Sequence, residues 1–385
     1  MHIILIARHY PPEVTGGARR PSLLTRALRG LGHRVTLVTP FQNADFEDHL
    51  YVPHPIQHIG NPLSSTKPQS LSLKMKIRTL LRQWLLWPDP EIRWASRVKA
   101  ELLAANYQPD WVMTTSPPES LHVIGSEVAK SFGCHWITEC RDTWFLNPHR
   151  DILEASALRR FFERRIARKA FARLTAVTAV SEAVMNDIRS VIPAQTPELL
   201  IGHFSTALPD DKKVEGRIKL PRKDINLVHS GGFSLSDRRR KLEPLLQALK
   251  RSKRTDLHLH IAGRLTEKER ELSMANYPFK VSLHGQVTLE QSQALQTDAD
   301  ALLLITPDES HALPGKYAEY LLAGRPILFS GGGDWLSLVD DVSTLSPLEL
   351  GLETVKKASE RSVIPASALT HEDAAKKLVK FLENI

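Results

Sequence analysis

The chain alternates short apolar runs of strand length with longer helical stretches, and it does so twice. In the first half, the apolar runs lie at residues 2–7, 34–39, 111–115, 135–139, 175–180 and 198–202. The pattern restarts in the second half, with runs at residues 225–230, 257–262, 281–284, 301–306 and 326–330. Strands that alternate with helices form a parallel sheet with helices on both faces. The sequence therefore predicts an α/β protein with two doubly wound domains.

The boundary between the two domains is predicted from a charged segment. A chain of 385 residues is long enough for two domains, each with its own core. Residues 209–224 are charged, contain Gly and Pro, and lack apolar periodicity, which is typical of a linker. We expect Rossmann-like domains over residues 1–208 and 225–365. Residues 41–75 show no clear periodicity and predict a long loop region.

Composition narrows the class of protein. Hydrophobic residues make up 42% and charged residues 24% of the chain, as in ordinary soluble globular proteins. The two cysteines, Cys134 and Cys140, predict neither a disulfide framework nor a zinc site. The apolar N-terminal run is too short for a signal peptide, so we read it as a strand and expect no transmembrane helix. We expect a cytoplasmic protein.

The net charge predicts anionic partners. The formal charge is +8 at pH 7, and nucleic acid, an anionic membrane and a nucleotide-sugar diphosphate would all match it. No signature of a nucleic-acid-binding module is present, so we do not expect nucleic acid. Residues 158–173 and 74–87 are basic and amphipathic. Either segment could lie on an anionic membrane or form a helix with a solvated basic face.

Residues 314–328, PGKYAEYLLAGRPIL, predict a loop, a short helix and a buried strand in succession. The first turn of the helix leaves backbone N–H groups unpaired at the positive end of the helix dipole, which suits an anion. Gly315 precedes this turn, and Gly324 predicts a left-handed cap at the other end. Lys316 and Glu319 share a face, as a cation for phosphates and a carboxylate for ribose hydroxyls. An ordinary solvated Lys/Glu pair is the alternative.

This segment follows the apolar run 301–306, and ligands of open α/β sheets bind at the carboxyl edge of such strands. The pattern PGKYxEYLxAGRPIL resembles the donor-site segment of GT-B nucleotide-sugar glycosyltransferases, in particular the family-four-like group of polysaccharide and lipid-linked glycan enzymes. The resemblance runs through nearly the whole chain. It implies a GT-B fold, with two Rossmann-like domains facing a central cleft. It also implies that a terminal helix, here 371–385, packs back on the first domain.

Further candidates follow other predicted strands. Gly16 and Gly17 remove side chains where the backbone must approach a ligand closely, and the resemblance places this pair near the donor diphosphate and the acceptor. Asp142 lies where relatives carry a cleft residue close to the reacting sugar. It could orient a hydroxyl or act as a base, whereas a structural pair with Arg141 is the alternative.

In the second half, Gly232 follows strand 225–230, and a basic run occupies residues 238–241. Enzymes of this shape place basic residues here on the leaving diphosphate, and we select Arg239 and Lys241. Many family-four enzymes also carry a glutamate eight positions before the one matched by Glu319. This chain has His311 there, so His311 or the displaced Glu309 takes that role. The catalytic candidates are therefore Asp142, Glu319 and His311.

The resemblance implies a glycosyltransferase that moves a sugar from a nucleoside diphosphate sugar, with UDP as the expected nucleotide, to a glycan or lipid-linked glycan. It also implies retention of anomeric configuration without a metal or other cofactor, and possible contact with the inner face of the cell membrane. Two rivals are kept. A nucleotide-sugar 2-epimerase shares the two-domain frame but needs no acceptor, and a non-catalytic nucleic-acid-binding or anion-binding protein is suggested by charge alone.

Overall fold

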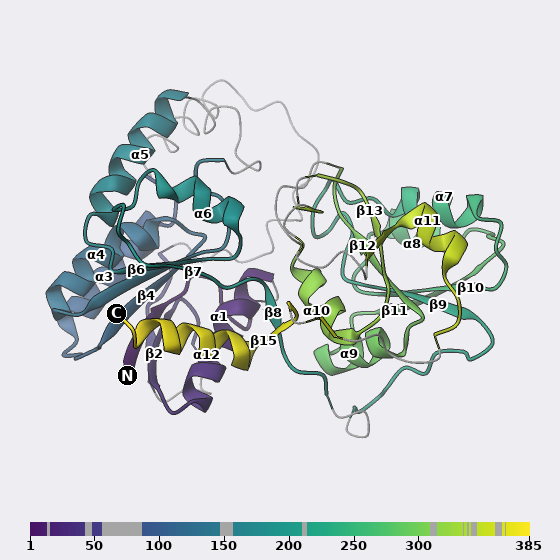
Figure 1. The fold of residues 1–385 in the computed structure, drawn as a ribbon, viewed down its shortest axis with the longest axis horizontal. Coiled ribbons are helices and arrows are strands. Elements are labelled where there is room, and N and C mark those ends of the chain that lie inside the picture. The colour runs from purple at the N-terminus through teal and green to yellow at the C-terminus, as the bar shows by residue number, and fades with distance from the viewer. Residues whose placement is uncertain are drawn as a thin grey trace. The chain divides into compact units, whose positions relative to one another are not determined.

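The computed structural model describes residues 1–13, 16–42, 48–55, 87–146, 157–209, 214–308, 314–333, 335–336, 339, 345–358, 364–365 and 367–385. The chain divides into two compact units (Figure 1). The first comprises Met1–Gly202 with His371–Ile385, and the second comprises His203–Thr370. Each contains a parallel sheet with helices, so the predicted α/β architecture is confirmed.

In its described part, the first unit has a seven-stranded parallel sheet in the order β3-β2-β1-β4-β5-β6-β7. Its strands are β1 (His2–Ile6), β2 (Arg34–Thr39), β3 (His49–Tyr51), β4 (Trp111–Ser116), β5 (His135–Cys140), β6 (Ala176–Ala179) and β7 (Glu198–Leu200). Its helices are α1 (Gly16–Gly30), α3 (Ile92–Ala104), α4 (Ser120–Phe132), α5 (Ala157–Phe171), α6 (Glu182–Arg189) and α12 (His371–Leu382). The order of the strands reverses between β1 and β4. Ligands of doubly wound sheets bind at such a switch point, at the carboxyl ends of the strands.

The core of this unit explains why its strands are apolar on both faces. Trp94, Trp136 and Phe171 are fully buried in one cluster with residues of β4 and β6. Helix α12 packs against α1, and its buried residues Ala374, Ala375, Leu378 and Leu382 recur at helical spacing. The C-terminal helix is therefore part of the first unit.

The described part of the second unit repeats the doubly wound pattern in a six-stranded sheet with the order β11-β10-β9-β12-β13-β14. Its strands are β9 (Ile225–Ser230), β10 (Leu257–Ala262), β11 (Lys280–Gly285), β12 (Ala301–Ile305), β13 (Ile327–Ser330) and β14 (Leu345–Pro347). Its helices are α7 (Leu242–Arg251), α8 (Glu267–Ser273), α9 (Leu289–Asp298), α10 (Gly315–Ala323) and α11 (Leu348–Thr354). The short strands β8 (Phe204–Ser205) and β15 (Leu369–Thr370) pair with each other. The switch point lies between β9 and β12.

Local sequence signals fix several helix ends. Thr266 and Thr288 begin α8 and α9 with capping boxes, because each hydroxyl accepts from the N–H three residues on. Gly324 ends α10 with a φ of +63°, so the predicted left-handed cap is confirmed.

The structure differs from the sequence prediction at the strands of least hydrophobicity. Strand β3 lies in residues 41–75, which were predicted as loop, and β14 lies beyond the last predicted strand, residues 326–330. The first unit ends at Gly202 rather than at residue 208, because Phe204 and Ser205 pair with β15. Within the predicted linker, Ile218 and Leu220 pack against a core cluster of the second unit. A polar sequence can therefore still be anchored by a few apolar side chains.

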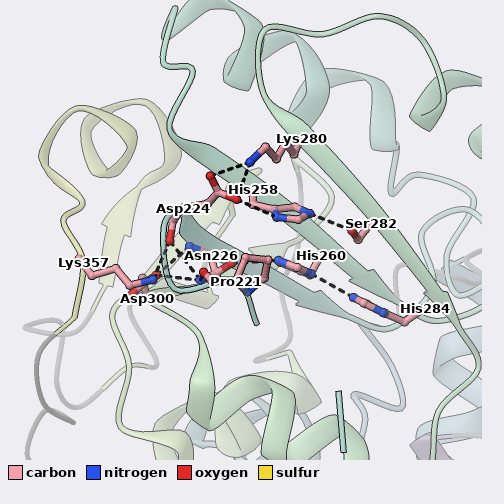
Figure 2. A network of polar contacts seen from close by, with 10 residues as sticks. All are labelled: Pro221, Asp224, Asn226, His258, His260, Lys280, Ser282, His284, Asp300 and Lys357. Atoms are coloured by element: carbon pink, nitrogen blue, oxygen red, sulfur yellow. Dashed lines mark hydrogen bonds and ion pairs between the residues drawn. The ribbon is translucent and has the colours of Figure 1, made fainter. Parts of the chain in front are cut away.

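Histidines line one face of strands β10 and β11, beside β9 (Figure 2). His260 Nε2 lies 3.1 Å from Asn226 Oδ1, and His260 Nδ1 lies 3.0 Å from His284 Nε2. His258 stacks on His260, with ring centroids 4.0 Å apart. Asn226 Oδ1 can only accept, so His260 carries its proton on Nε2 and accepts from His284. Burial is the main cause that lowers the pKa of all three, that of His260 to about 3.

Acidification from about pH 7.5 to about pH 5.5 is expected to lower the free energy of unfolding by about 1 kcal/mol through His260 alone. The pKa of His260 in the folded protein lies below the ordinary value of 6.5. The unfolded chain therefore takes up the proton first. This stability is complete above pH 6.5 and is lost as the pH falls below it toward the folded-state pKa.

Urea unfolding of the wild type and of His260→Gln at both pH values measures this effect. The glutamine keeps an N–H group for Asn226 but does not titrate, so its unfolding free energy should change less with pH. Equal pH dependence in the two proteins would contradict the prediction.

Candidate functional site

Close backbone contacts shape the carboxyl edge of the second sheet. A Cβ atom on Gly263, after β10, would lie 2.1 Å from the carbonyl oxygen of Gly231, after β9. A Cβ atom on Gly331, after β13, would lie 2.1 Å from the carbonyl oxygen of Thr306. Any side chain at residue 263 or 331 would push these loops apart, so the two glycines keep the loops in contact.

Helix α10 begins at this edge with an open first turn. Among the residues that the structure describes, none lies within 4 Å of a Cβ atom built on Gly315, and Pro314 at the N-cap makes no side-chain cap. The first N–H groups of a helix lack intrahelical partners and lie at the positive end of its dipole. This helix start therefore offers donors to an anion.

Lys316 and Glu319, predicted together from sequence, are in contact. Lys316 Nζ lies 2.8 Å from Glu319 Oε2, and Gln296 Nε2 donates to the same oxygen at 3.3 Å. The Glu319 side chain is 6% exposed, whereas that of Lys316 is 32% exposed. Lys316 Cε would lie 3.9 Å from a Cβ atom on Gly231. The lysine therefore lies beside the glycine loop after β9.

A tyrosine that the sequence analysis did not select joins α10 to this loop. The Tyr320 hydroxyl accepts from the backbone N–H of Ser230 at 3.1 Å and donates to the carbonyl of Leu303 at 3.3 Å. Burial raises the pKa of Tyr320 to about 12, so the hydroxyl keeps its proton. These bonds join α10 to the end of β9 and to the middle of β12.

Two buried nitrogen atoms at this edge have no hydrogen-bond partner among the described residues: His229 Nε2 and Arg240 Nε. A Cβ atom on Gly231 would lie 3.8 Å from His229 Nε2, on the glycine that also borders Lys316. Burial lowers the pKa of Arg240, and the charges of Lys316 and Arg240 in turn lower that of His229 after the larger effect of burial. Lys316 and His229 therefore border the same glycine, and the charge of Arg240 acts on the same imidazole.

The structure separates Arg240 from the basic residues selected by sequence. Arg239 Nη2 lies 2.9 Å from Asp237 and its side chain is 42% exposed. Lys241 is exposed at the N-cap of α7. Gly232 lies close to Ser236 instead, with a built Cβ 2.8 Å from its hydroxyl oxygen. A run of four basic residues gives no signal from which Arg240, which is half-buried and has a buried Nε, could have been chosen.

At the carboxyl edge of the first sheet, Arg141 connects three segments of backbone. Its guanidinium donates to the carbonyls of Ser116 at 2.7 Å, Pro117 at 3.2 Å and Gly17. An arginine that donates to three carbonyls supports the start of α1, which carries Gly17. Asp142, next in the chain, is exposed. Gly16 begins α1.

A buried ion pair lies under the same edge. Arg20 Nε lies 2.8 Å from Glu139 Oε1, and the two side chains are 8% and 2% exposed. Arg20 also donates to the carbonyls of Ile201 and Gly202, while Thr115 donates to Glu139 at 2.7 Å. Burial raises the pKa of Glu139, but Arg20 and Arg141 outweigh burial and keep it below its ordinary value. The pair therefore stays charged.

Sequence reasoning also missed polar pairs after β1. His9 Nδ1 lies 3.0 Å from Glu13 Oε2, and Gly17 packs beside His9. Arg8 pairs with Glu91 at 2.9 Å. The sequence places these residues next to a strand end, but their partners are set by the tertiary fold.

Some predictions lie outside the described residues. These are His311, Glu309 and nearly all of the basic segment 74–87, in which only Trp87 is described. Within the described ranges, no group of three or more His, Cys, Asp or Glu residues could hold a metal ion. No helix there is long and apolar enough to span a lipid bilayer.

Comparison with known proteins relates this geometry to a class of enzyme. Residues 15–200 match the family model described as glycosyl transferase 4-like domain. No curated protein sequence matches the chain.

Solved structures match over its whole length. HepE from Anabaena in complex with UDP-glucose has a TM-score of 0.59 at 13% identity, and all of both chains is covered. The lipopolysaccharide outer core galactosyltransferase WaaB has a TM-score of 0.56 at 14% identity, covering 100% of this chain and 99% of WaaB. The catalytic domain of starch synthase IV from Arabidopsis thaliana, bound to ADP and acarbose, has a TM-score of 0.59 at 12% identity, covering 100% and 99%.

At these identities the solved structures establish the fold, and the matched domain establishes the class of enzyme. The resemblance of residues 314–328 to the donor-site segment of such enzymes agrees with both. The chain is therefore a glycosyltransferase of the GT-B fold, with a glycosyl transferase 4-like domain over residues 15–200.

Proposed function

We propose that the protein transfers a sugar from a nucleoside diphosphate sugar, with UDP as the nucleotide, to a hydroxyl of a glycan or lipid-linked glycan. The second unit binds the donor and the first binds the acceptor. The observation that carries this proposal is that Lys316, in the first turn of α10, borders Gly231 together with His229, on which the charge of Arg240 also acts. The structure of HepE with UDP-glucose supports a uridine donor.

In the proposed site, the diphosphate lies against the start of α10. Lys316 leaves Glu319 to bind the phosphate oxygens, and Arg240 Nε, which has no partner among the described residues, donates to them as well. Glu319 then accepts from the ribose hydroxyls. Gly231 has no side chain, so the diphosphate can approach the backbone of this loop closely.

The transfer replaces one bond to the anomeric carbon by another. The bond to the diphosphate oxygen breaks, the acceptor oxygen bonds to the anomeric carbon on the same face, and the acceptor proton passes to the departing diphosphate. Because the new bond forms on the same face, we propose a retaining reaction. Lys316, Arg240 and the helix dipole stabilise the negative charge that develops on the diphosphate, so we propose that the reaction needs no metal. On the acceptor side, exposed Asp142 orients the attacking hydroxyl.

A lipid-linked acceptor would bring the protein to a membrane, and α5 suits such contact. Phe161 and Phe162 on this helix are 62% and 41% exposed. Arg160, Arg165 and Arg168 lie on the same helix and carry charge that anionic lipids attract. We therefore propose that this surface rests on the cytoplasmic leaflet.

A donor panel tests the proposed function. UDP-sugars at about 100 times their Kd should stabilise the protein by about 2.7 kcal/mol and raise its Tm by several degrees, more than GDP-sugars or dTDP-sugars do. With bacterial lipid extract, sugar should pass to lipid and UDP should be released. Conversion of the donor to its epimer without acceptor would favour the epimerase instead. No shift and no transfer with any donor would overturn the proposal.

A further inference from the structure

His229 is held in one orientation at the end of β9. Its Nδ1 lies 2.9 Å from the carbonyl oxygen of Leu303 on β12, and its ring stacks on Phe233 with centroids 4.4 Å apart. The residue is 5% exposed. A buried ring with a fixed hydrogen bond and a stacked neighbour has little freedom to turn, so its second nitrogen points in a defined direction.

The hydrogen bond to Leu303 fixes the tautomer. A carbonyl oxygen can only accept, so Nδ1 carries the proton. Burial, together with the positive charges of Lys316 and Arg240, lowers the pKa of His229 to about 4, and the ring is therefore neutral near pH 7. Its Nε2 then carries a lone pair and can only accept a hydrogen bond. That nitrogen is buried and has no partner among the described residues.

The surroundings of Nε2 show what kind of group could satisfy it. Gly231 borders both Nε2 and Lys316 Cε, at 3.8 and 3.9 Å from a built Cβ atom. Phosphate oxygens of a bound diphosphate carry no protons near pH 7 and cannot donate to a lone pair. The group that meets Nε2 must be a hydrogen-bond donor carried close to the phosphates, and a sugar hydroxyl is such a group.

We propose that His229 is a specificity-determining residue of the donor site, whose Nε2 accepts a hydrogen bond from a hydroxyl of the transferred sugar. The inference depends on the proposed donor site, where Lys316 and Arg240 hold the phosphates and Glu319 the ribose. A sugar whose hydroxyl points away from Nε2 would leave a buried acceptor unsatisfied and would bind less well.

Two variants separate the nitrogens of the ring. The amide of His229→Asn retains an N–H group near the Nδ1 position for Leu303 but has no acceptor at Nε2. The longer amide of His229→Gln carries an oxygen near the Nε2 position. Calorimetry measures the Kd of UDP and of UDP-glucose, UDP-galactose and UDP-N-acetylglucosamine for each protein, and the Tm of each variant checks its folding.

His229→Asn should weaken the UDP-sugar that the wild type binds most tightly by about 5–10-fold and leave the Kd of UDP within about twofold. His229→Gln should retain most of the affinity for that sugar. Equal weakening of UDP and UDP-sugar would overturn the inference. A pH series gives a second contradicting outcome. If UDP bound the wild type more tightly as the pH fell from 8 to 6, and bound His229→Asn equally well at every pH, the inference would be overturned. The ring would then bind phosphate as a cation.

Deoxyfluoro analogues of that UDP-sugar provide a second measurement that depends less on the variants. Replacing one hydroxyl by fluorine should weaken binding to the wild type but not further weaken binding to His229→Asn. If every fluorine replacement weakened binding to His229→Asn as much as it weakened binding to the wild type, the inference would be overturned, but the proposed donor site would stand. Failure of UDP and all UDP-sugars to bind the wild type would remove the donor site itself, and this inference with it.

Discussion

Arg240→Ala is expected to lower the rate of sugar transfer by about 100–1,000-fold, as loss of a group that stabilises developing negative charge does in other enzymes. Arg240 has a buried Nε without a partner among the described residues, and it affects the pKa of His229 at the same loop. Its positive charge therefore acts at this loop before the diphosphate binds. The measurement is kcat and KM for the UDP-sugar identified by the donor panel.

Arg238→Ala is the matched control, because Arg238 is exposed in the same basic run and its replacement makes the same change in net charge. Its activity should stay within about twofold of the wild type, as expected for a screened surface charge. Lys316→Ala should weaken UDP binding by at least as much as Arg240→Ala does. If Arg238→Ala and Arg240→Ala were equally active, the half-buried guanidinium of Arg240 would not contact the diphosphate.

Glu139→Ala is expected to lower the free energy of unfolding of the first unit by about 3–5 kcal/mol. The substitution leaves the Arg20 charge buried without its carboxylate and removes the acceptor of the Thr115 hydroxyl. A loss of that size is a large part of the stability of a typical domain. Urea unfolding followed by circular dichroism measures it.

Glu127→Ala is the control in the same unit, because Glu127 pairs with Lys99 while its side chain is 60% exposed. Its unfolding free energy should change by at most about 1 kcal/mol. Replacing both members of the buried pair, as Arg20→Met with Glu139→Leu, should recover much of the loss, because the Arg20 charge is removed together with its carboxylate. Similar losses for Glu127→Ala and Glu139→Ala would show that burial does not determine the strength of these pairs.

Strands that are covered by helices on both faces of a sheet were predictable from sequence, because side chains buried on either face must be apolar. All eleven apolar runs of the sequence analysis contain strands of the two sheets. Strands β3 and β14 were missed because few apolar side chains mark them: their sequences are HLY and LSP. They are held by backbone pairing with β2 and β13 rather than by apolar side chains.

The candidate site was predictable in part. Lys316 and Glu319 share a helix, and the spacing of three residues brings them together wherever the helix lies. His229 and Arg240 were missed because their significance comes from burial and from neighbours far along the chain. Leu303, the partner of His229, is 74 residues away. The roles of Asp142, Gly16 and Gly17 stay predictions.

The sequence by itself determined the two doubly wound sheets, the left-handed cap at Gly324 and the Lys316–Glu319 pair, because each depends on periodicity or on contacts within a few residues. Tertiary structure decided which one of four consecutive basic residues is half-buried, which carbonyls hold Arg141, and which way His229 faces. These features depend on contacts between separate strands and loops. Contacts of that kind form when a parallel sheet brings the ends of distant strands to one edge.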